Sequence, residues 1–95
     1  MDDQEKILTL HPQGKKGVNI MKHKYDVIYA FIAKKLKDGK PRTFESLSDQ
    51  AVKELTDSFD GKVLWYFVTV KLDMEARGII ERVPKTSPHQ IQLKS

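Results

Sequence analysis

Apolar residues recur at helical spacing in the first half of the chain. Between residues 19 and 37 they fall three or four positions apart, which is typical of a helix with one buried face. The buried positions are Tyr25, Ile28, Ile32 and Leu36, with Val27 and Phe31 widening the stripe. Asn19 is predicted to cap this helix, because its side chain can accept a free amide of the first turn. Gly39 and Pro41 end it, since glycine suits a left-handed cap and proline cannot continue the helix.

A second, shorter helix is predicted over residues 44–55, FESLSDQAVKEL. Thr43 is its predicted cap, and Glu45 lies where a negative charge favours the positive end of the helix dipole. Its buried side consists of Phe44, Leu47, Ala51 or Val52, and Leu55. The linker over residues 56–61 is rich in turn-forming residues, and we expect Phe59 to anchor it to the core.

The third helix, predicted over residues 62–77, has two apolar stripes. At about 100° per residue, one stripe faces the other helices as core, with a polar arc beside it. The core stripe is Val63, Phe67, Val70 and Met74; the arc is Lys62, Tyr66, Thr69, Asp73 and Arg77. The second stripe is Leu64, Trp65, Val68, Leu72 and Ala76, with Lys71 and Glu75 at its margin. It is too broad for a solvated face and needs a cover, which the N-terminal arm, the C-terminal hairpin or a second copy can supply. We expect Trp65 to be packed and Tyr66 to be exposed.

A short apolar run precedes the helices. Residues 7–10, ILTL, predict a strand or extended arm that stops at Pro12, because proline lacks a backbone donor. Residues 13–17 contain two glycines and two lysines and predict a flexible basic turn. We expect residues 1–18 to form an N-terminal arm and loop outside the main domain.

A β-hairpin is predicted after the third helix. Residues 79–83 and 89–94 are rich in strand-forming residues, and prolines bracket the tip between them, where they do not interrupt the ladder. The tip offers donors suited to phosphates at Lys85, Thr86 and Ser87. With the three helices, this hairpin completes an α+β domain over residues 19–95.

The composition describes one ordinary globular domain. The 95 residues are 39% hydrophobic and 32% charged, and are too few for two domains. No apolar run approaches the roughly 20 residues of a membrane span. The absence of cysteine and an acidic start unlike a secretory signal predict a cytoplasmic location. The formal charge of +4 favours polyanionic partners.

No residue pattern predicts catalysis or metal binding. The three histidines lie apart without metal-ligand spacing and with no cysteine to join them: His11, His23 and His89. The glycines of residues 13–17 lack the spacing of a phosphate-binding loop. Neither a Ser-His-Asp order, a carboxylate pair nor a cofactor fingerprint is present. We therefore predict a protein that is not an enzyme and that uses no metal or cofactor.

The junction after the third helix, MEARGIIERVP, resembles the LEEKGLIERV run of many winged helix-turn-helix transcription regulators. The predicted order of helix, helix, turn, helix and hairpin resembles the same superfamily. More narrowly, HPQGKKGVNI, KYDVIYAFI and VLWYFVTVKLDMEARGIIERVP resemble a small bacterial family of uncharacterised winged-helix-like proteins. The resemblance implies a winged helix fold, three helices plus a C-terminal wing, over residues 19–95.

By this resemblance the domain is expected to bind double-stranded DNA, as a transcriptional regulator does. The helix over residues 62–77 would lie in the major groove, and the wing tip, residues 84–89, would reach phosphates or the minor groove. On the helix, the residues expected to meet DNA first are Lys62, Trp65, Tyr66 and Thr69, with Lys71 and Arg77 nearer the backbone. Phosphate contacts would supply most of the affinity.

A second hypothesis keeps the fold but not the DNA. Recognition helices usually begin with several polar residues, whereas this helix begins VLWYFV. In the alternative, the domain contacts a protein partner, or a second copy of itself, through Leu64, Trp65, Val68 and Leu72. This alternative requires an uncovered apolar patch. The exposure of Trp65 therefore separates the two hypotheses.

Overall fold

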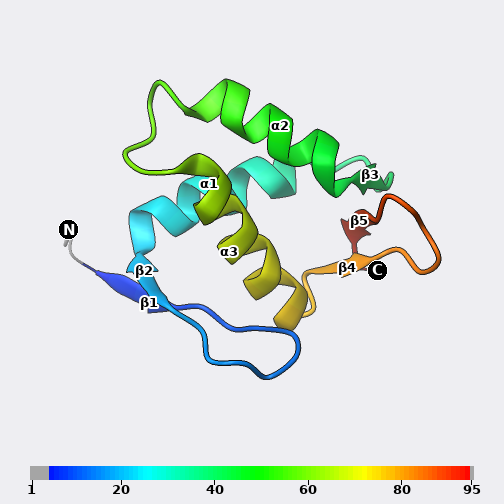
Figure 1. Ribbon diagram of the computed structural model, residues 1–95, viewed down its shortest axis with the longest axis horizontal. Coiled ribbons are helices and arrows are strands. Elements are labelled where there is room, and N and C mark those ends of the chain that lie inside the picture. Colours follow the sequence, from blue (N-terminus) through cyan, green and yellow to red (C-terminus); the bar gives the residue numbers. More distant parts are fainter. Residues whose placement is uncertain (1–4, 95) are drawn as a thin grey trace.

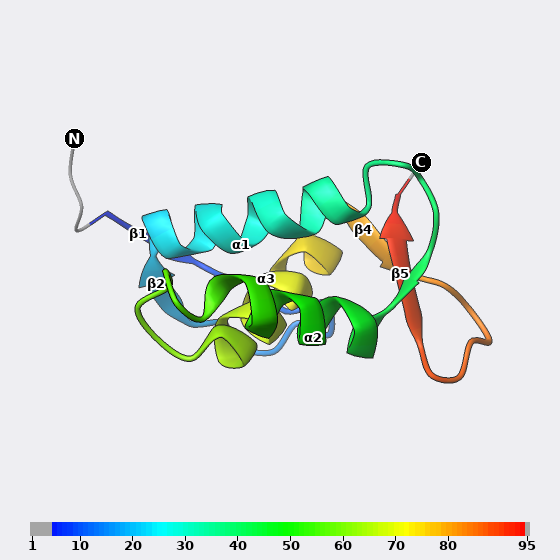
Figure 2. The same cartoon turned by 90° about the horizontal axis from the view of Figure 1, so that it is seen from above.

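The computed structural model of the chain describes residues 5–94 and has an α+β architecture (Figure 1). Three helices enclose one core, with a small antiparallel sheet at each end of the helical layer (Figure 2). The elements in chain order are β1 (Lys6–Leu8), β2 (Asn19–Met21), α1 (Lys22–Lys35), β3 (Arg42–Thr43), α2 (Phe44–Leu55), α3 (Val63–Ala76), β4 (Ile80–Arg82) and β5 (Gln90–Leu93). None of the helices within the described residues is long and apolar enough to cross a membrane.

An N-terminal hairpin takes the place of the single arm that the sequence predicted. β1 pairs antiparallel with β2, so that Ile7 lies opposite Ile20. The prediction that Asn19 caps the first helix is therefore wrong: Asn19 lies in a strand, α1 begins at Lys22, and Met21 precedes it without a side-chain cap bond. An extended apolar segment needs partners for its backbone groups, and residues 19–21 supply them.

The loop of this hairpin brings Gly17 against the opposite strand. A Cβ on Gly17 would lie 1.6 Å from the carbonyl oxygen of Thr9, which is backbone and cannot swing aside. We predict that Gly17→Ala lowers the free energy of unfolding by about 1 to 3 kcal/mol, as overpacking does. Urea denaturation checks this, with the exposed neighbour Lys16→Ala as the control that should unfold like the wild type. Equal midpoints for Gly17→Ala and the wild type would contradict this packing of the hairpin.

The core consists of one face from each helix together with the sheet at the C-terminal end. The buried apolar side chains are Tyr25, Ile28, Phe31, Ile32 and Leu36 around α1, Leu47 and Ala51 on α2, Val63, Phe67, Val70 and Met74 on α3, and Ile20, Phe59, Ile80 and Ile91. These positions confirm the predicted helical stripes and the anchoring role of Phe59. Val27 is the exception, because it is exposed and does not widen the stripe of α1.

The start of α2 and the end of α1 follow the predicted signals. The hydroxyl of Thr43 accepts a hydrogen bond from the amide of Ser46 at 3.1 Å, which confirms the cap of α2. α1 ends at Lys35, two residues before the predicted end, and Gly39 beyond it has a φ of +77°. A positive φ is the conformation that glycine adopts without a steric penalty.

The C-terminal hairpin pairs with a third strand. β5 lies between β3 and β4, with Arg42 opposite Ile91 on one side and Ile80 opposite Leu93 on the other. The predicted hairpin is confirmed, with strands shorter than expected. The pairing of Arg42 and Thr43 with β5 was not predicted from the sequence. This sheet covers the end of the helical layer that lies away from β1 and β2 (Figure 2).

Candidate interaction surface

α3 has one face in the core and one face directed outward. At about 100° per residue, Trp65 and Leu72 point away from the core residues Phe67 and Val70. Leu64 and Trp65, at the first turn, are 50% and 47% exposed. Such exposure is unusual for adjacent large apolar side chains on a helix that is otherwise well packed. The outward face of α3 is therefore the part of the molecule that needs a functional explanation.

The two adjacent aromatic residues have the reverse of the expected roles. Tyr66 is half-buried because its ring packs edge-on against Phe59, with ring centroids 5.1 Å apart. The Trp65 ring lies edge-on to the Tyr66 ring, with centroids 4.9 Å apart, and Trp65 is 47% exposed. The expectations of a packed Trp65 and an exposed Tyr66 are both wrong, because the linker around Phe59, and not a terminal segment, packs against the start of α3.

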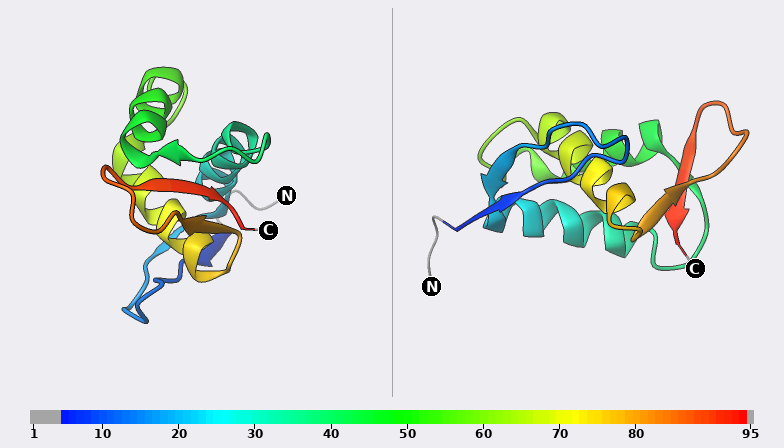
Figure 3. Two further views of the ribbon diagram at one scale, coloured as in Figure 1. Left: turned by 90° about the vertical axis from the view of Figure 1, so that its right-hand side faces the viewer. Right: turned by 90° about the horizontal axis from the view of Figure 1, so that it is seen from below.

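The loop between β1 and β2 lies over the C-terminal half of α3 (Figure 3). It leaves Val68 and Leu72 half-buried. A recess of about 110 Å³ opens between the loop and the helix, with Leu10, Val18 and Leu72 as apolar walls and Thr69 and Lys16 on its lining. The predicted cover over the second apolar stripe is thus present for only half of its length, and the exposed half carries Leu64 and Trp65.

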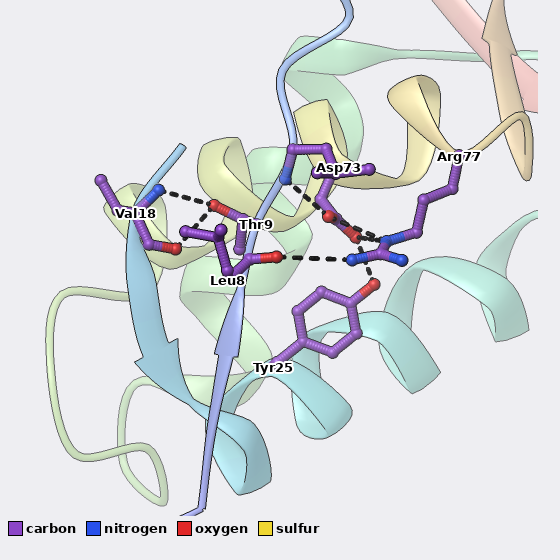
Figure 4. Close-up of polar contacts among 7 residues, drawn as sticks. Leu8, Thr9, Val18, Tyr25, Asp73 and Arg77 are labelled. Atoms are coloured by element: carbon purple, nitrogen blue, oxygen red, sulfur yellow. Dashed lines mark hydrogen bonds and ion pairs between the residues drawn. The ribbon is translucent and has the colours of Figure 1, made fainter. Parts of the chain in front are cut away.

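Asp73 fixes the hairpin against α3 (Figure 4). Its side chain is fully buried and accepts hydrogen bonds from the Leu10 amide at 2.8 Å, from the Tyr25 hydroxyl, and from the Arg77 guanidinium at 2.9 Å. Arg77 also donates to the carbonyl of Leu8 at 3.4 Å. One carboxylate thus joins the hairpin, α1 and α3. We call Tyr25, Asp73 and Arg77 with the Leu8 and Leu10 backbone the Asp73 latch.

The pKa values of Tyr25 and Arg77 are both raised within the Asp73 latch. Burial, and then the hydrogen bond to Asp73, raise the pKa of the Tyr25 hydroxyl well above its ordinary value. The hydrogen bond to Asp73 also raises the pKa of Arg77. Both groups therefore keep their protons across the physiological range, and the buried negative charge of the carboxylate stays compensated. The one signal for the latch in the sequence is the spacing of four residues between Asp73 and Arg77 on a predicted helix.

Basic residues surround the outward face of α3. Lys62 precedes the first turn, and Lys15 and Lys16 lie in the hairpin loop beside the recess. All three are exposed, and none forms an ion pair with another residue between 5 and 94. The carboxylates of α3 do not offset them, because Asp73 is held in the latch and Glu75 pairs with Lys71. The carboxylate of Asp60, two residues before Lys62, lies 3.9 Å from the ammonium of Lys24. The exposed apolar surface therefore has a positively charged rim with a lysine at each end that is unpaired among the described residues, Lys62 and Lys16.

A family model described as a family of unknown function (DUF6958) matches residues 6–91. The chain belongs to this family. No curated protein and no solved structure matches it. The DUF6958 match begins at Lys6, the first residue of β1, so the family unit includes the N-terminal hairpin as well as the helices. The predicted resemblance to an uncharacterised family agrees with this match, which names no winged helix.

Several DNA contacts expected on α3 of this DUF6958 chain are engaged inside the molecule. Lys71 is only 7% exposed, pairs with Glu75, and lies with its ammonium 5.3 Å from the ring centre of Phe44. Arg77 is held by Asp73, and the Thr69 hydroxyl donates to the carbonyl of Trp65 at 2.9 Å. Lys71 was expected at the margin of the second apolar stripe, close to the DNA backbone. It is buried because its aliphatic stem packs beneath α2 and its ammonium meets Glu75 one turn away.

The tip of the β4–β5 hairpin in the DUF6958 chain, which was the predicted wing tip, is only partly available. The Thr86 hydroxyl donates to the Val83 carbonyl at 2.9 Å and accepts from the Gln90 amide at 3.0 Å, so it closes the turn. Lys85 and Ser87 are exposed, and Lys85 has a φ of +61°. The structure thus leaves four of the nine expected contact residues exposed and without a side-chain hydrogen bond or ion pair among the described residues: Lys62, Trp65, Lys85 and Ser87.

His89 directly precedes β5 and packs against Phe44 of α2, so it is not free at the hairpin tip. Its ring stacks on Phe44, with centroids 5.2 Å apart, and its Nε2 is buried without a hydrogen-bond partner among the described residues. Burial, together with Lys71 and Arg82, lowers the pKa of His89, and only Glu75 opposes them. Between residues 5 and 94, no group of three or more potential metal ligands is present.

The lowered pKa of His89 predicts acid sensitivity. The folded state disfavours the protonated His89 ring. The contribution of neutral His89 to stability is therefore complete above the ordinary histidine pKa of about 6.5, and it is lost as the pH falls through the lower pKa of the folded state. We expect the free energy of unfolding to fall between pH 7 and pH 5, and to fall less in His89→Phe, which keeps the stacking on Phe44. Urea titrations of both proteins at each pH measure the difference. The same pH dependence in both would contradict this role.

Proposed function

We propose that the chain is a winged helix-turn-helix domain that acts as a non-catalytic protein-binding module. The fold proposal is supported by the order of α1, α2 and α3 followed by the β4–β5 hairpin, with β3 joining the hairpin at β5. In this arrangement β4 and β5 form the wing. Fold alone does not define function, so the functional proposal depends on the outward face of α3.

The exposure of Trp65 and Leu64 is the observation that carries the proposal. In a helix that reads DNA, the outward positions need donors and acceptors for the base edges. Here those positions are apolar, and the hairpin loop stands over the next two turns. Aromatic and aliphatic side chains that are exposed together in a positively charged rim are typical of a protein-binding surface.

A library of displayed helical peptides tests the proposal without a known partner. We expect peptides that are enriched on the wild-type chain and lost on Trp65→Ala. Val52→Ala is the matched control, because Val52 is an exposed apolar residue on α2, away from this surface. The control should retain the same peptides. Enrichment that does not depend on Trp65, or no enrichment on a folded chain, would contradict the proposal.

DNA binding is the second candidate function, and the charges of the wing favour it. Arg82, Lys85 and Lys94 are exposed and form no ion pair with another described residue. Phosphate contacts by such residues would give an affinity that falls steeply between about 50 mM and 200 mM salt. Anisotropy of a labelled random duplex measures this, with Arg82→Ala and Lys85→Ala expected to weaken binding. No binding at the lower salt would exclude this candidate.

A further inference from the structure

We propose that the partner of this surface is an acidic amphipathic helix that lies along the outward face of α3. The proposal rests on the protein-binding function above and adds the chemical class of the partner. Three features of the molecule carry it: the charge of the rim, the recess beside α3, and the spacing between that recess and Trp65.

The rim selects for negative charge. Lys62 lies at one end of the apolar surface, and Lys16 lies at the other end on the lining of the recess. No carboxylate of α3 is free to neutralise them, because Asp73 and Glu75 are both paired within the molecule. Carboxylates placed at both ends of a bound segment would therefore meet unpaired cations, which improves both specificity and the rate of association.

The recess and Trp65 set the apolar contacts. A water molecule takes about 30 Å³ in the liquid, so a recess of about 110 Å³ accommodates one aliphatic side chain. Leu72 in its wall and Trp65 are seven residues apart, or roughly 10 Å along the helix axis. Two apolar residues at positions i and i+7 of a partner helix have the same separation. This is the helix-in-groove mode of recognition, with one side chain in the recess and one against Trp65.

The same features disfavour other occupants. A second copy of the chain would bring a basic rim close to another basic rim, in a protein that already has a formal charge of +4. A bilayer surface would not fill the recess beside Leu72. Duplex DNA would meet apolar side chains where base edges need polar ones. An acidic amphipathic helix can pair with the lysines of the rim, fill the recess and cover Trp65 at the same time.

The only tryptophan of the chain is itself the reporter for the test. We would titrate the full chain with three synthetic helical peptides that share leucines at i and i+7 and carry Glu, Gln or Lys at the flanking positions. We expect the Glu peptide to shift the Trp65 emission to shorter wavelength and to bind about tenfold more tightly than the Lys peptide at low salt, with the difference shrinking as salt rises.

Charge reversal at the rim sharpens the test. The double variant Lys16→Glu with Lys62→Glu should lose the preference for the Glu peptide and gain one for the Lys peptide, while keeping its fold. Lys53→Glu, an exposed position on α2, is the matched control and should bind all three peptides like the wild type. A reversed preference in the double variant and not in the control supports the proposal.

The outcomes separate this inference from the function on which it rests. Equal or tighter binding of the Gln or Lys peptide would overturn the acidic partner and leave protein binding in place. Absence of a Trp65 shift with every peptide, together with a shift on adding duplex DNA or anionic phosphatidylserine vesicles, would overturn both. A shift that depends only on the concentration of the chain would show that a second copy is the occupant.

Discussion

Replacing Asp73 with alanine is expected to lower the free energy of unfolding by about 2 to 4 kcal/mol. The substitution leaves the Leu10 amide, the Tyr25 hydroxyl and the Arg77 guanidinium without their shared acceptor, and unmade buried hydrogen bonds carry the full cost of desolvation. Removing one partner of a fully buried ion pair typically lowers stability by more than this. The cost is smaller here because the Arg77 side chain is 36% exposed and its guanidinium can be solvated. Urea denaturation measures the change.

Two further measurements assign this loss to the latch. The amide of Leu10 should exchange its hydrogen faster in Asp73→Ala, because that amide donates directly to the missing carboxylate. Asp26→Ala is the control, since Asp26 forms an exposed ion pair with Lys22 at 3.0 Å and contributes little to stability. If Asp73→Ala and Asp26→Ala unfold at the same urea concentration, the hairpin is not held by Asp73.

Phe67→Ala is expected to lower the free energy of unfolding strongly and Trp65→Ala hardly at all, although the two residues lie on the same helix. Phe67 is fully buried and packs against the ring of Phe44 at 5.6 Å, so its loss should cost about 3 to 5 kcal/mol. Trp65 is half-exposed, and its loss should change stability by less than about 1 kcal/mol. Thermal and urea unfolding of both variants check the contrast. A large loss of stability in Trp65→Ala would mean that its indole belongs to the core.

The helices and the C-terminal hairpin are readable from the sequence because their signals are local. The spacing of Ile28, Ile32 and Leu36 fixes the buried face of α1, and the Thr43 cap needs only the amide three residues later. The N-terminal hairpin was missed for the opposite reason. Its pairing joins residues 6–8 to residues 19–21 across a loop. Asparagine is a favoured helix cap and is rare in strands, so Asn19 indicated the start of a helix.

The candidate site was only partly predictable. The periodicity correctly located a second apolar stripe on α3. Which half of this stripe the N-terminal hairpin covers depends on Asp73, which binds the Leu10 amide and the Tyr25 hydroxyl from elsewhere in the chain. Lys71 and Arg77 illustrate the same limit. Each lies four positions from a carboxylate on the same helix, a spacing that the sequence shows. What the sequence does not show is the burial of these pairs, because the 7% exposure of Lys71 and the 0% exposure of Asp73 depend on packing against other elements.

Collisional quenching of Trp65 tests the central claim most directly, because it reports both the exposure of the indole and the charge around it. We predict that iodide quenches the emission of the free chain strongly, and that the ratio of iodide to caesium quenching at the same ionic strength exceeds that of free N-acetyltryptophanamide, since Lys15, Lys16 and Lys62 attract the anion. Protection of Trp65 from both ions, or a ratio no higher than that of free N-acetyltryptophanamide, would contradict an exposed apolar surface with a basic rim.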